Sequence, residues 1–341
     1  MDVKELKNYI YENRYVEQIL ESIGCHHIKY HASSGYWTCA NATGDNNGAI
    51  VLYDNEYLMC LNYTRQMING NRKTDIVDLV CYTQDLTFPK GLNFICEVIG
   101  MSYYHDFDDD IPESFKILKM INDMNSDSVE EKEKPLKPIS ENILSYYKPY
   151  VNDLFFDDHI DYETQKKFEI GFDEESNRYT IPIRSELGDL VGVKGRYFNR
   201  KVPEGENKYI YLEPCARSKV LYGLDKTIEY IKNKNRLYVL EAEKAVLQLW
   251  GYGYRNCIST GGKKLSQYQA DMIVRLGAMI VFSFDKDVTK EELEILAERF
   301  PDGVSLYYMF DEDNILEEHE SPSDNPLKWQ YMVKNNIYKL R

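Results

Sequence analysis

The stretch from residue 236 to residue 310 alternates short apolar runs with amphipathic segments. RLYVLEAE precedes KAVLQLWGYG, NCIST leads through GGKK into LSQYQADMIVRLG, AMIVFSFDKD precedes KEELEILAERF, and VSLYYMF closes the series. Alternation of strand-like and helix-like segments predicts a parallel β-sheet with helices on its faces. No other pattern in the chain narrows the choice of folds as far.

Acidic residues stand where two of these expected strands end: Glu241 and Glu243 close YVLEAE, and Asp285 and Asp287 close FSFDKD. Ligands of open α/β sheets bind beyond the carboxyl ends of the strands. In an extended strand, Asp285 and Asp287 would share one side and a cation, while Lys286 turns away. Converging carboxylates repel one another unless a hard cation neutralises them, and Mg²⁺ suits such oxygen ligands. The alternative is that acids at strand ends only cap the next helix.

The first hundred residues follow a different pattern. Residues 3–23 carry apolar residues at helical spacing, and Gly24 follows as a stop. Between residues 28 and 63, short aromatic-rich runs are broken by Gly, Asn and Asp, which predicts a small antiparallel sheet. Two short helices are then expected over DIVDLVCYTQ and FPKGLNFICEVIG, with Pro89 near the start of the second.

A polar, proline-bearing stretch without an apolar face, residues 122–138, is predicted to be a linker at a domain boundary. Beyond it, residues 177–197 form two strand-like runs around a Gly-Asp turn, which indicates a hairpin. A chain of 341 residues, 43% hydrophobic and 28% charged, is expected to fold into two or three globular domains.

The formal net charge of -15 excludes a chain that coats nucleic acid or an anionic membrane with its whole surface, so any polyanion contact must come from a local basic patch. The start of the chain has no signal-peptide pattern, and no apolar run approaches the roughly 18 residues that span a bilayer. Seven widely spread cysteines are typical of reduced thiols. We therefore expect a cytoplasmic protein without membrane contact.

Three segments in the second half of the chain, taken in order, resemble the TOPRIM fold of bacterial-type primases, topoisomerases and some nucleases: YVLEAEKAV, ISTGGKKLSQYQ and IVFSFDKD. The segments before them resemble the polymerase domain of bacterial-type (DnaG-like) DNA primases: NRYTIPIRSELGDLVGVKGRY, NKYIYLEP and SKVLYGLDKT. The N-terminal region, from GYWTCAN through EYLMCLNY to DLTFPKGLNFI, resembles the primase zinc-ribbon domain and its trailing helices. The resemblance covers about residues 5–100 and 140–325.

The resemblance implies a fold of mixed class, α+β and α/β. A small antiparallel zinc-ribbon-like domain would occupy residues 1–121, followed by the linker at 122–138. A mixed α+β subdomain with a basic template groove would occupy residues 139–234. The TOPRIM subdomain, with its parallel sheet, would occupy residues 235–341.

The ribbon departs from the family, which carries a Cys-x-x-His and a Cys-x-x-Cys pair. The corresponding positions here read Cys39 with Ala42, and Cys60 with Tyr63. Two thiolates cannot complete a tetrahedral zinc site, so we expect a ribbon without zinc. An unorthodox site would draw on neighbours in sequence, and its candidate ligands are Cys25, His27, Cys39 and Cys60, with His26 and His31 close by. The simpler alternative is that Cys25 and one histidine only pack or lie in a turn.

The TOPRIM motif departs as well. Relatives carry Gly and Asp where this chain has Ala242 and Ala245, and the usual Ala-Gly after the second Asp is missing. A later acidic cluster of the family is best matched by Asp324 in SPSDNP, with Asp311 and Asp313 as substitutes. These departures bear on activity more than on ancestry.

The resemblance implies synthesis of RNA primers on single-stranded DNA by metal-dependent nucleotidyl transfer. Two divalent cations, Mg²⁺ or Mn²⁺, would lower the pKa of the attacking 3′-hydroxyl and neutralise the leaving pyrophosphate. Glu241, Asp285 and Asp287, together with Asp324, would hold the metals. Glu241 is alternatively the proton acceptor.

Template and nucleotides require cations, and residues 184–219 interleave basic and aromatic side chains, a combination typical of single-strand grooves. The alternative is a solvated hairpin with ordinary surface lysines. The expected binding residues are Arg184, Lys194, Arg196, Lys208, Tyr209 and Lys219.

Three functions follow from these observations. The first is a compact primase from a phage or other mobile element in a bacterial host, with single-stranded DNA, ribonucleoside triphosphates and a replicative helicase or other replisome protein as partners. The second is a TOPRIM nuclease that uses the same acids. The third is a single-stranded DNA-binding relative with weakened catalysis, suggested by Ala242, Ala245 and the lost zinc ligands.

Overall fold

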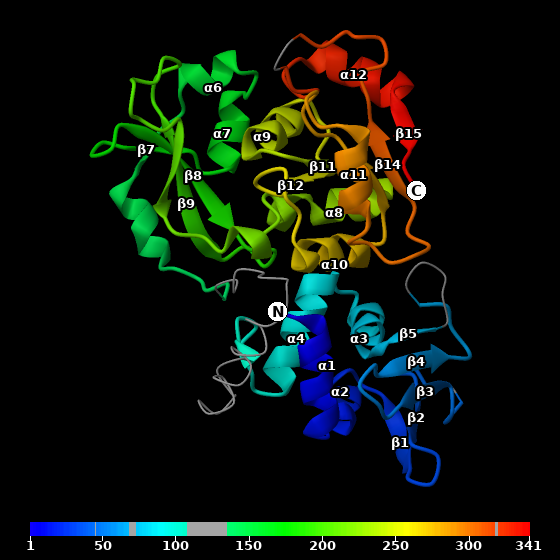
Figure 1. The fold of residues 1–341 in the computed structure, drawn as a ribbon. Coiled ribbons are helices and arrows are strands. Elements are labelled where there is room, and N and C mark those ends of the chain that lie inside the picture. The colour runs from blue at the N-terminus through cyan, green and yellow to red at the C-terminus, as the bar shows by residue number, and fades with distance from the viewer. Residues whose placement is uncertain (45, 68–72, 108–134, 318–319) are drawn as a thin grey trace, which may run out of the picture. The chain divides into compact units, whose positions relative to one another are not determined.

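The computed structural model describes residues 1–44, 46–67, 73–107, 135–317 and 320–341 (Figure 1). The chain forms two compact units, Met1–Lys132 and Glu133–Arg341. Most of the expected linker, residues 122–134, lies outside the described residues. The expected domain limits at residues 121, 138 and 234 therefore stay predictions.

The first unit begins with two helices, α1 (Val3–Glu12) and α2 (Val16–Ser22), where the sequence pattern predicted one. The side chain of Asp2 caps α1 by accepting hydrogen bonds from the backbone N–H groups of Lys4 and Glu5. Between the helices Arg14 has a φ of 62°, in the left-handed region that a continuous helix does not allow. Each helix nevertheless buries apolar residues, Leu6 and Ile10 in α1 and Val16, Ile19 and Leu20 in α2.

Five antiparallel strands follow in simple sequential order, as expected for this region: β1 (His26–His31), β2 (Tyr36–Ala40), β3 (Ile50–Tyr53), β4 (Met59–Asn62) and β5 (Lys73–Asp75). Two helices follow, α3 (Ile76–Gln84) and α4 (Phe88–Val98), and Pro89 stands in the first turn of α4 as predicted. Leu52, Cys60 and Leu92 are among the fully buried residues of this core.

The second unit opens with a five-stranded antiparallel sheet whose strand order is β10-β9-β8-β7-β6. The predicted hairpin is formed by β8 (Arg178–Arg184) and β9 (Leu190–Tyr197), which turn at Gly188. The other elements are η3 (Glu141–Tyr146), β6 (Lys148–Pro149), α6 (Asp153–Asp157), α7 (Tyr162–Lys167), β7 (Gly171–Asp173), β10 (Tyr209–Glu213) and the short 3₁₀ helix η4 (Arg217–Lys219).

The predicted alternating segment forms a second sheet in the same unit, with strand order β12-β11-β13-β14-β15. The first four strands are parallel, and only β15 runs antiparallel, against β14. The elements are α8 (Leu224–Lys234), β11 (Arg236–Leu240), α9 (Glu243–Gly251), β12 (Cys257–Ser259), α10 (Gln267–Arg275), β13 (Met279–Phe282), α11 (Lys290–Ala297), β14 (Leu306–Met309), α12 (Pro326–Asn335) and β15 (Ile337–Lys339).

Helices cover both faces of this sheet (Figure 1). Tyr238 of β11 and Trp329 of α12 pack edge to face with ring centroids 5.1 Å apart, and both side chains are buried. Parallel strands bring their carboxyl ends to one edge, and β11, β12 and β13 all end there. The fold thus combines an N-terminal antiparallel sheet with a mostly parallel C-terminal sheet.

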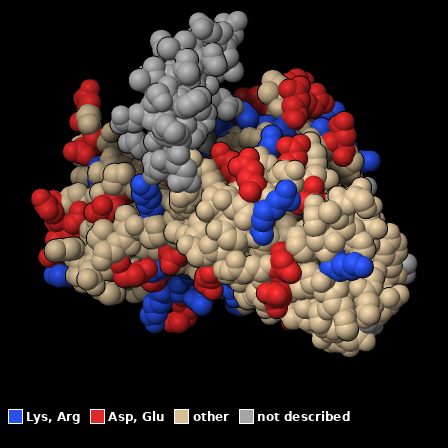
Figure 2. All heavy atoms as spheres, turned by 90° about the horizontal axis from the view of Figure 1, so that it is seen from below, with Lys and Arg blue, Asp and Glu red and all other residues tan. Residues whose placement is uncertain are grey.

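Charged side chains of both signs are interspersed on the face seen in Figure 2, and cations do not gather into one extended area there. This distribution agrees with the net charge of -15, which allows polyanion contact only at local sites. Within the described residues, no helix has the length and apolar character needed to cross a membrane.

Candidate active site

Glu241 lies at the carboxyl edge of the parallel sheet, directly after β11. Its side chain is half-buried, and its Oε2 atom is buried without a hydrogen-bond partner among the described residues. Burial and the nearby Asp285, with a smaller effect of Asp287, raise the pKa of Glu241 to about 6, although Lys263 opposes the shift. An unpartnered carboxylate oxygen in such surroundings is costly and suits a cation ligand.

Asp285 and Asp287 follow β13, but the strand ends at Phe282, three residues before Asp285. The strand alternation predicted for this pair therefore does not apply, because residues 286 and 287 form a turn. Lys286 does turn away, and its Nζ atom donates to the carbonyl of Leu316 at 2.8 Å. Burial raises the pKa of Asp285, and Asp287 and Asp324 add to the shift.

These mutual effects define one group of neighbours, Glu241, Asp285, Asp287 and Asp324, which we call the acidic cluster. Asp324 lies in the turn before α12, so the cluster joins the ends of β11 and β13 to a segment remote in sequence. Burial raises the pKa of Asp324, but Lys244 and Gln248 outweigh that effect and hold the pKa below its usual value.

Two lysines that the sequence reasoning missed hold acids of this cluster. Lys263, in the loop after β12, lies 2.6 Å from Asp287, and Lys244 of α9 lies 2.6 Å from Asp324. The GGKK stretch that follows a strand at the ligand-binding edge is a sequence signal that points to Lys263. Each lysine thus neutralises one of the clustered acids.

Gln248 is a second residue that the sequence did not indicate. Its Nε2 atom donates to Asp324 Oδ1 at 3.1 Å and to the carbonyl of Asp158 at 2.7 Å, and its Oε1 accepts from Ser323 Oγ at 2.9 Å. It is buried and thereby fixes the turn that carries Asp324. Asp311 and Asp313, which the sequence offered in place of Asp324, make other hydrogen bonds. Asp311 accepts from the backbone N–H groups of Ile315 and Leu316. Asp313 accepts from the side chains of Tyr331 and Asn336.

The cluster offers only carboxylate oxygens, which are the donors that Mg²⁺ and Mn²⁺ prefer, and Glu241 Oε2 has no other partner in the described chain. The residues therefore fit a divalent cation by their chemistry. Across the described ranges, no three Asp, Glu, His or Cys side chains are grouped closely enough to hold a metal ion as they stand. Full coordination would require Asp287 and Asp324 to exchange their lysine partners for the cation.

Glu243 does not end a strand as expected but begins α9, where it is buried. Its two oxygens lie 2.7 and 2.9 Å from Nζ of Lys194, a residue of β9. The same ammonium lies 5.1 Å from the ring centroid of Tyr209. This pair links β9 of the antiparallel sheet to α9, the helix that follows β11.

Four of the six expected nucleic-acid-binding residues lie together on β9 and at β10: Lys194, Arg196, Lys208 and Tyr209. Arg196 pairs in register with Tyr209, is buried, and donates to the carbonyl of Asn199 at 2.6 Å. Desolvation, Arg196 and Lys244 lower the pKa of Lys208, which places this lysine close to both cations. Asp324 partly offsets that effect, so the basic group adjoins the acidic cluster.

The other two expected residues stand on β8 and η4. Arg184, at the far end of β8, is bound by Glu169 at 2.6 Å and Glu141 at 2.8 Å, so its guanidinium is already neutralised. Lys219 ends η4, the short helix whose Arg217 carbonyl accepts a hydrogen bond from Gln269. Binding of nucleic acid by Arg184 and Lys219 stays a prediction.

Three of the zinc candidates are neighbours in the first unit. Cys25, Cys39 and Cys60 are buried free thiols, and a hydrogen bond with Cys39 lowers the pKa of Cys25. The same hydrogen bond and burial raise the pKa of Cys39, and burial raises that of Cys60. His27 is exposed and has a φ of 54°.

Comparison with known proteins finds relatives in bacteria. The SPbeta prophage-derived uncharacterized protein YorJ of Bacillus subtilis (strain 168) is 27% identical over 217 residues, which are 55% of this chain and 57% of that protein. The DNA primase of Deinococcus radiodurans is 32% identical over 120 residues, or 34% of this chain and 20% of the primase. The chain is a relative of the bacterial DnaG-type DNA primases.

This primase relative matches no protein-family model. Among solved structures, the zinc-binding and RNA polymerase domains of Aquifex aeolicus primase align with 99% of this chain and 87% of that chain, at 16% identity and a TM-score of 0.48. The matched segments span little more than half of the prophage protein and a fifth of the Deinococcus primase.

Proposed function

We propose that this chain is a primase that synthesises short RNA primers on single-stranded DNA by nucleotidyl transfer dependent on Mg²⁺ or Mn²⁺. The observation that carries the proposal is the buried, unpartnered Oε2 of Glu241 within the acidic cluster, at the ligand-binding edge of a parallel sheet. The names of the relatives, which include DNA primases, support the same reaction.

The acidic cluster would hold the divalent cations through Glu241, Asp285, Asp287 and Asp324. When bound, these cations supply charge neutralisation for the attacking 3′-hydroxyl and the leaving pyrophosphate. Glu241 is also suited to accept a proton, because a carboxylate whose pKa is about 6 can take up a proton near neutral pH.

The basic group of Lys194, Arg196, Lys208 and Tyr209 would hold the template beside the cluster. Arg196 and Tyr209 are fixed within the sheet, whereas Lys208 is exposed and can contact phosphate. Desolvation lowers the pKa of Lys208, and Arg196 and Lys244 stand close enough to lower it further, so the three cations together would attract phosphate.

A second candidate is a single-stranded DNA-binding relative with weakened catalysis. It is favoured by the two internal lysines, since Lys263 and Lys244 already neutralise Asp287 and Asp324. Ala242 and Ala245, which stand where the family carries Gly and Asp, point the same way. A metal-dependent nuclease would use the same carboxylates on the same phosphodiester bond.

The deciding experiment incubates labelled ribonucleotides and single-stranded DNA of varied sequence with the wild type, Asp285→Ala and Glu291→Gln. Glu291 is an exposed carboxylate of α11 outside the acidic cluster, so its variant serves as a matched control. We expect primers from the wild type and from the control. In Asp285→Ala, primer synthesis should fall by more than the ~10 to 100-fold that is lost when a hydrogen-bond partner of a metal ligand is removed.

Each other result points to a defined alternative. Products that survive Asp285→Ala would refute the site assignment. Degraded DNA without incorporated nucleotide would favour the nuclease, and tight DNA binding without synthesis in Mg²⁺ or Mn²⁺ would favour the non-catalytic relative. If the chain is a primase encoded by a phage or other mobile element, it acts in the cytoplasm of the bacterial host. A helicase or other replisome protein is then a further expected partner.

A further inference from the structure

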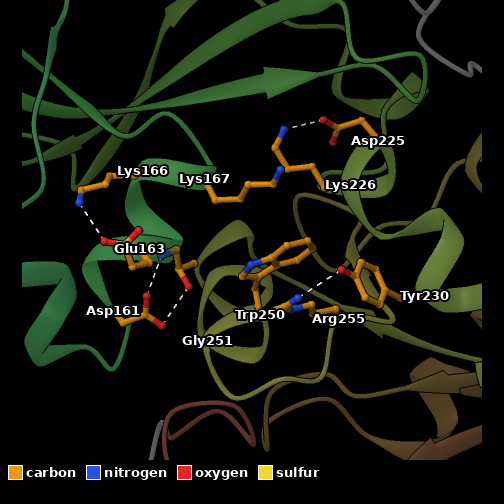
Figure 3. Close-up of a pocket in the computed structure, with 11 residues that line it drawn as sticks. Asp161, Glu163, Lys166, Lys167, Asp225, Lys226, Tyr230, Trp250, Gly251 and Arg255 are labelled. Carbon is orange, nitrogen blue, oxygen red and sulfur yellow. Dashed lines mark hydrogen bonds and ion pairs between the residues drawn. The ribbon is translucent and has the colours of Figure 1, made fainter.

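A hollow of about 800 Å³ opens between α7, α8 and α9 of the second unit, apart from the acidic cluster (Figure 3). None of the residues that line it belongs to that cluster or to the basic group on β9 and β10. Its volume lies within the range of small-molecule sites, about 300 to 1,000 Å³. The hollow therefore has the size of a binding site that the proposed reaction does not use.

The charges in this hollow are unbalanced in favour of cations. Lys166 lies 2.8 Å from Glu163, and Lys226 lies 2.6 Å from Asp225, so two of its four cations are neutralised. The remaining acid, Asp161, caps α7 by accepting from the backbone of Thr164 at 2.7 Å.

The two remaining cations are Lys167 and Arg255, and no ion pair joins either of them to a carboxylate of the described chain. In Figure 3 the side chain of Lys167 extends across the hollow toward that of Lys226. Two cations without acidic partners, in a protein whose net charge is -15, mark a local site for an anion.

A platform of Arg255, Trp250 and Tyr230 forms the opposite wall, and the two aromatic rings stand edge to face at 80°. The guanidinium of Arg255 lies 4.9 Å from the ring centroid of Trp250 and 5.6 Å from that of Tyr230, and it donates to the Tyr230 hydroxyl at 3.2 Å. Trp250 is buried, whereas Tyr230 is 38% exposed, so the platform rests on the protein core and has one side open to solvent. The guanidinium of Arg255 is itself planar and lies closer to Trp250, so it offers a group on which a nucleobase can stack.

We propose that this hollow binds a free nucleotide, with its phosphates against Lys167 and its base on the platform of Arg255 and Tyr230. The occupant combines the two features that the walls select, an anionic group and a planar ring. A hollow of about 800 Å³ between three helices has the size of a small-molecule site, which suits one nucleotide. The inference does not depend on the primase reaction, because it uses none of the proposed catalytic residues.

The test is calorimetric titration of the full chain with ATP, with inorganic tripolyphosphate and with an eight-nucleotide thymidine strand. EDTA is present throughout, which suppresses metal-dependent binding at the acidic cluster. We expect ATP to bind more tightly than tripolyphosphate. Lys167→Glu should weaken ATP binding at least tenfold, and Asp285→Ala should leave it unchanged.

Lys234→Glu is the matched control, because Lys234 is an exposed lysine of α8 outside the hollow, and ATP should bind this variant as it binds the wild type. Circular dichroism of each variant verifies folding. Absence of ATP binding to the wild type, equal binding of tripolyphosphate and ATP, or binding of the strand but not of ATP would each overturn the proposal. So would a loss in Lys234→Glu equal to that in Lys167→Glu.

Discussion

Lys263 supplies the positive charge that balances Asp287 in the acidic cluster. Its ammonium lies 2.6 Å from Asp287, and that hydrogen bond raises the pKa of Lys263. If a divalent ion must displace this ammonium, Lys263→Ala should bind Mn²⁺ several-fold more tightly than the wild type. Lys264→Ala, a change at the adjacent exposed lysine, should leave the affinity unchanged. Paramagnetic resonance of free Mn²⁺ measures both, and weaker binding to Lys263→Ala would contradict the idea.

The raised pKa of Glu241 predicts a pH-dependent stability of the metal-free protein. A folded pKa of about 6, above the ordinary value of 4.5, means that the folded state binds more protons than the unfolded state between these two values. Glu241 therefore contributes roughly 1 to 2 kcal/mol to the free energy of unfolding below pH 4.5, and this contribution is lost as the pH rises through 6.

Urea denaturation of the wild type and Glu241→Gln at pH 4.5 and pH 7.5, in EDTA, measures this effect. The difference in unfolding free energy between the two proteins should change by that amount in favour of the variant at the higher pH. Glu291→Gln serves as the exposed control and should show no such change. A difference between wild type and Glu241→Gln that is independent of pH would refute the assignment.

At the scale of elements, the pair of Lys194 and Glu243 joins β9 to α9, and both side chains are largely buried. Lys194→Met would leave Glu243 as a buried charge without its partner, which should cost roughly 3 to 5 kcal/mol in unfolding free energy. The double variant Lys194→Met/Glu243→Leu should recover most of that loss, because it removes both charges.

Lys148→Met is the matched control, since Lys148 forms an exposed ion pair with Glu174 in the same sheet and should change stability by less than about 1 kcal/mol. Urea unfolding of the four proteins completes the comparison. If Lys194→Met keeps full stability and loses only affinity for DNA, Lys194 serves the template and not the junction between the sheets.

At the scale of the whole molecule, the first unit is expected to fold without zinc. The thiols of Cys39 and Cys60 have raised pKa values, so metal binding would have to draw off protons that these sites hold firmly. Purified protein should contain no zinc by elemental analysis, and neither EDTA nor added Zn²⁺ should shift its thermal unfolding. One zinc per chain, or a transition lowered by EDTA, would contradict this prediction.

Much of the architecture could be predicted because it rests on local periodicity. The run from residue 236 indicated the parallel sheet, and the Gly-Asp turn indicated the β8–β9 hairpin. The pattern did not reveal α12 and β15, because their apolar residues acquire a buried face only against β11 and β14. Nor did it reveal the break near Arg14, because apolar residues continue at helical spacing on both sides of it.

The sequence by itself determined the order of the elements and the carboxyl edge at which Glu241, Asp285 and Asp287 lie, because strand and helix periods are local properties of the chain. Only the tertiary structure decided how each charge is used. Whether a lysine faces solvent, another sheet or an acid depends on segments far apart in sequence, as when Lys194 meets Glu243 and Lys263 meets Asp287. Charge interactions depend on distance in space, and that distance is set by packing.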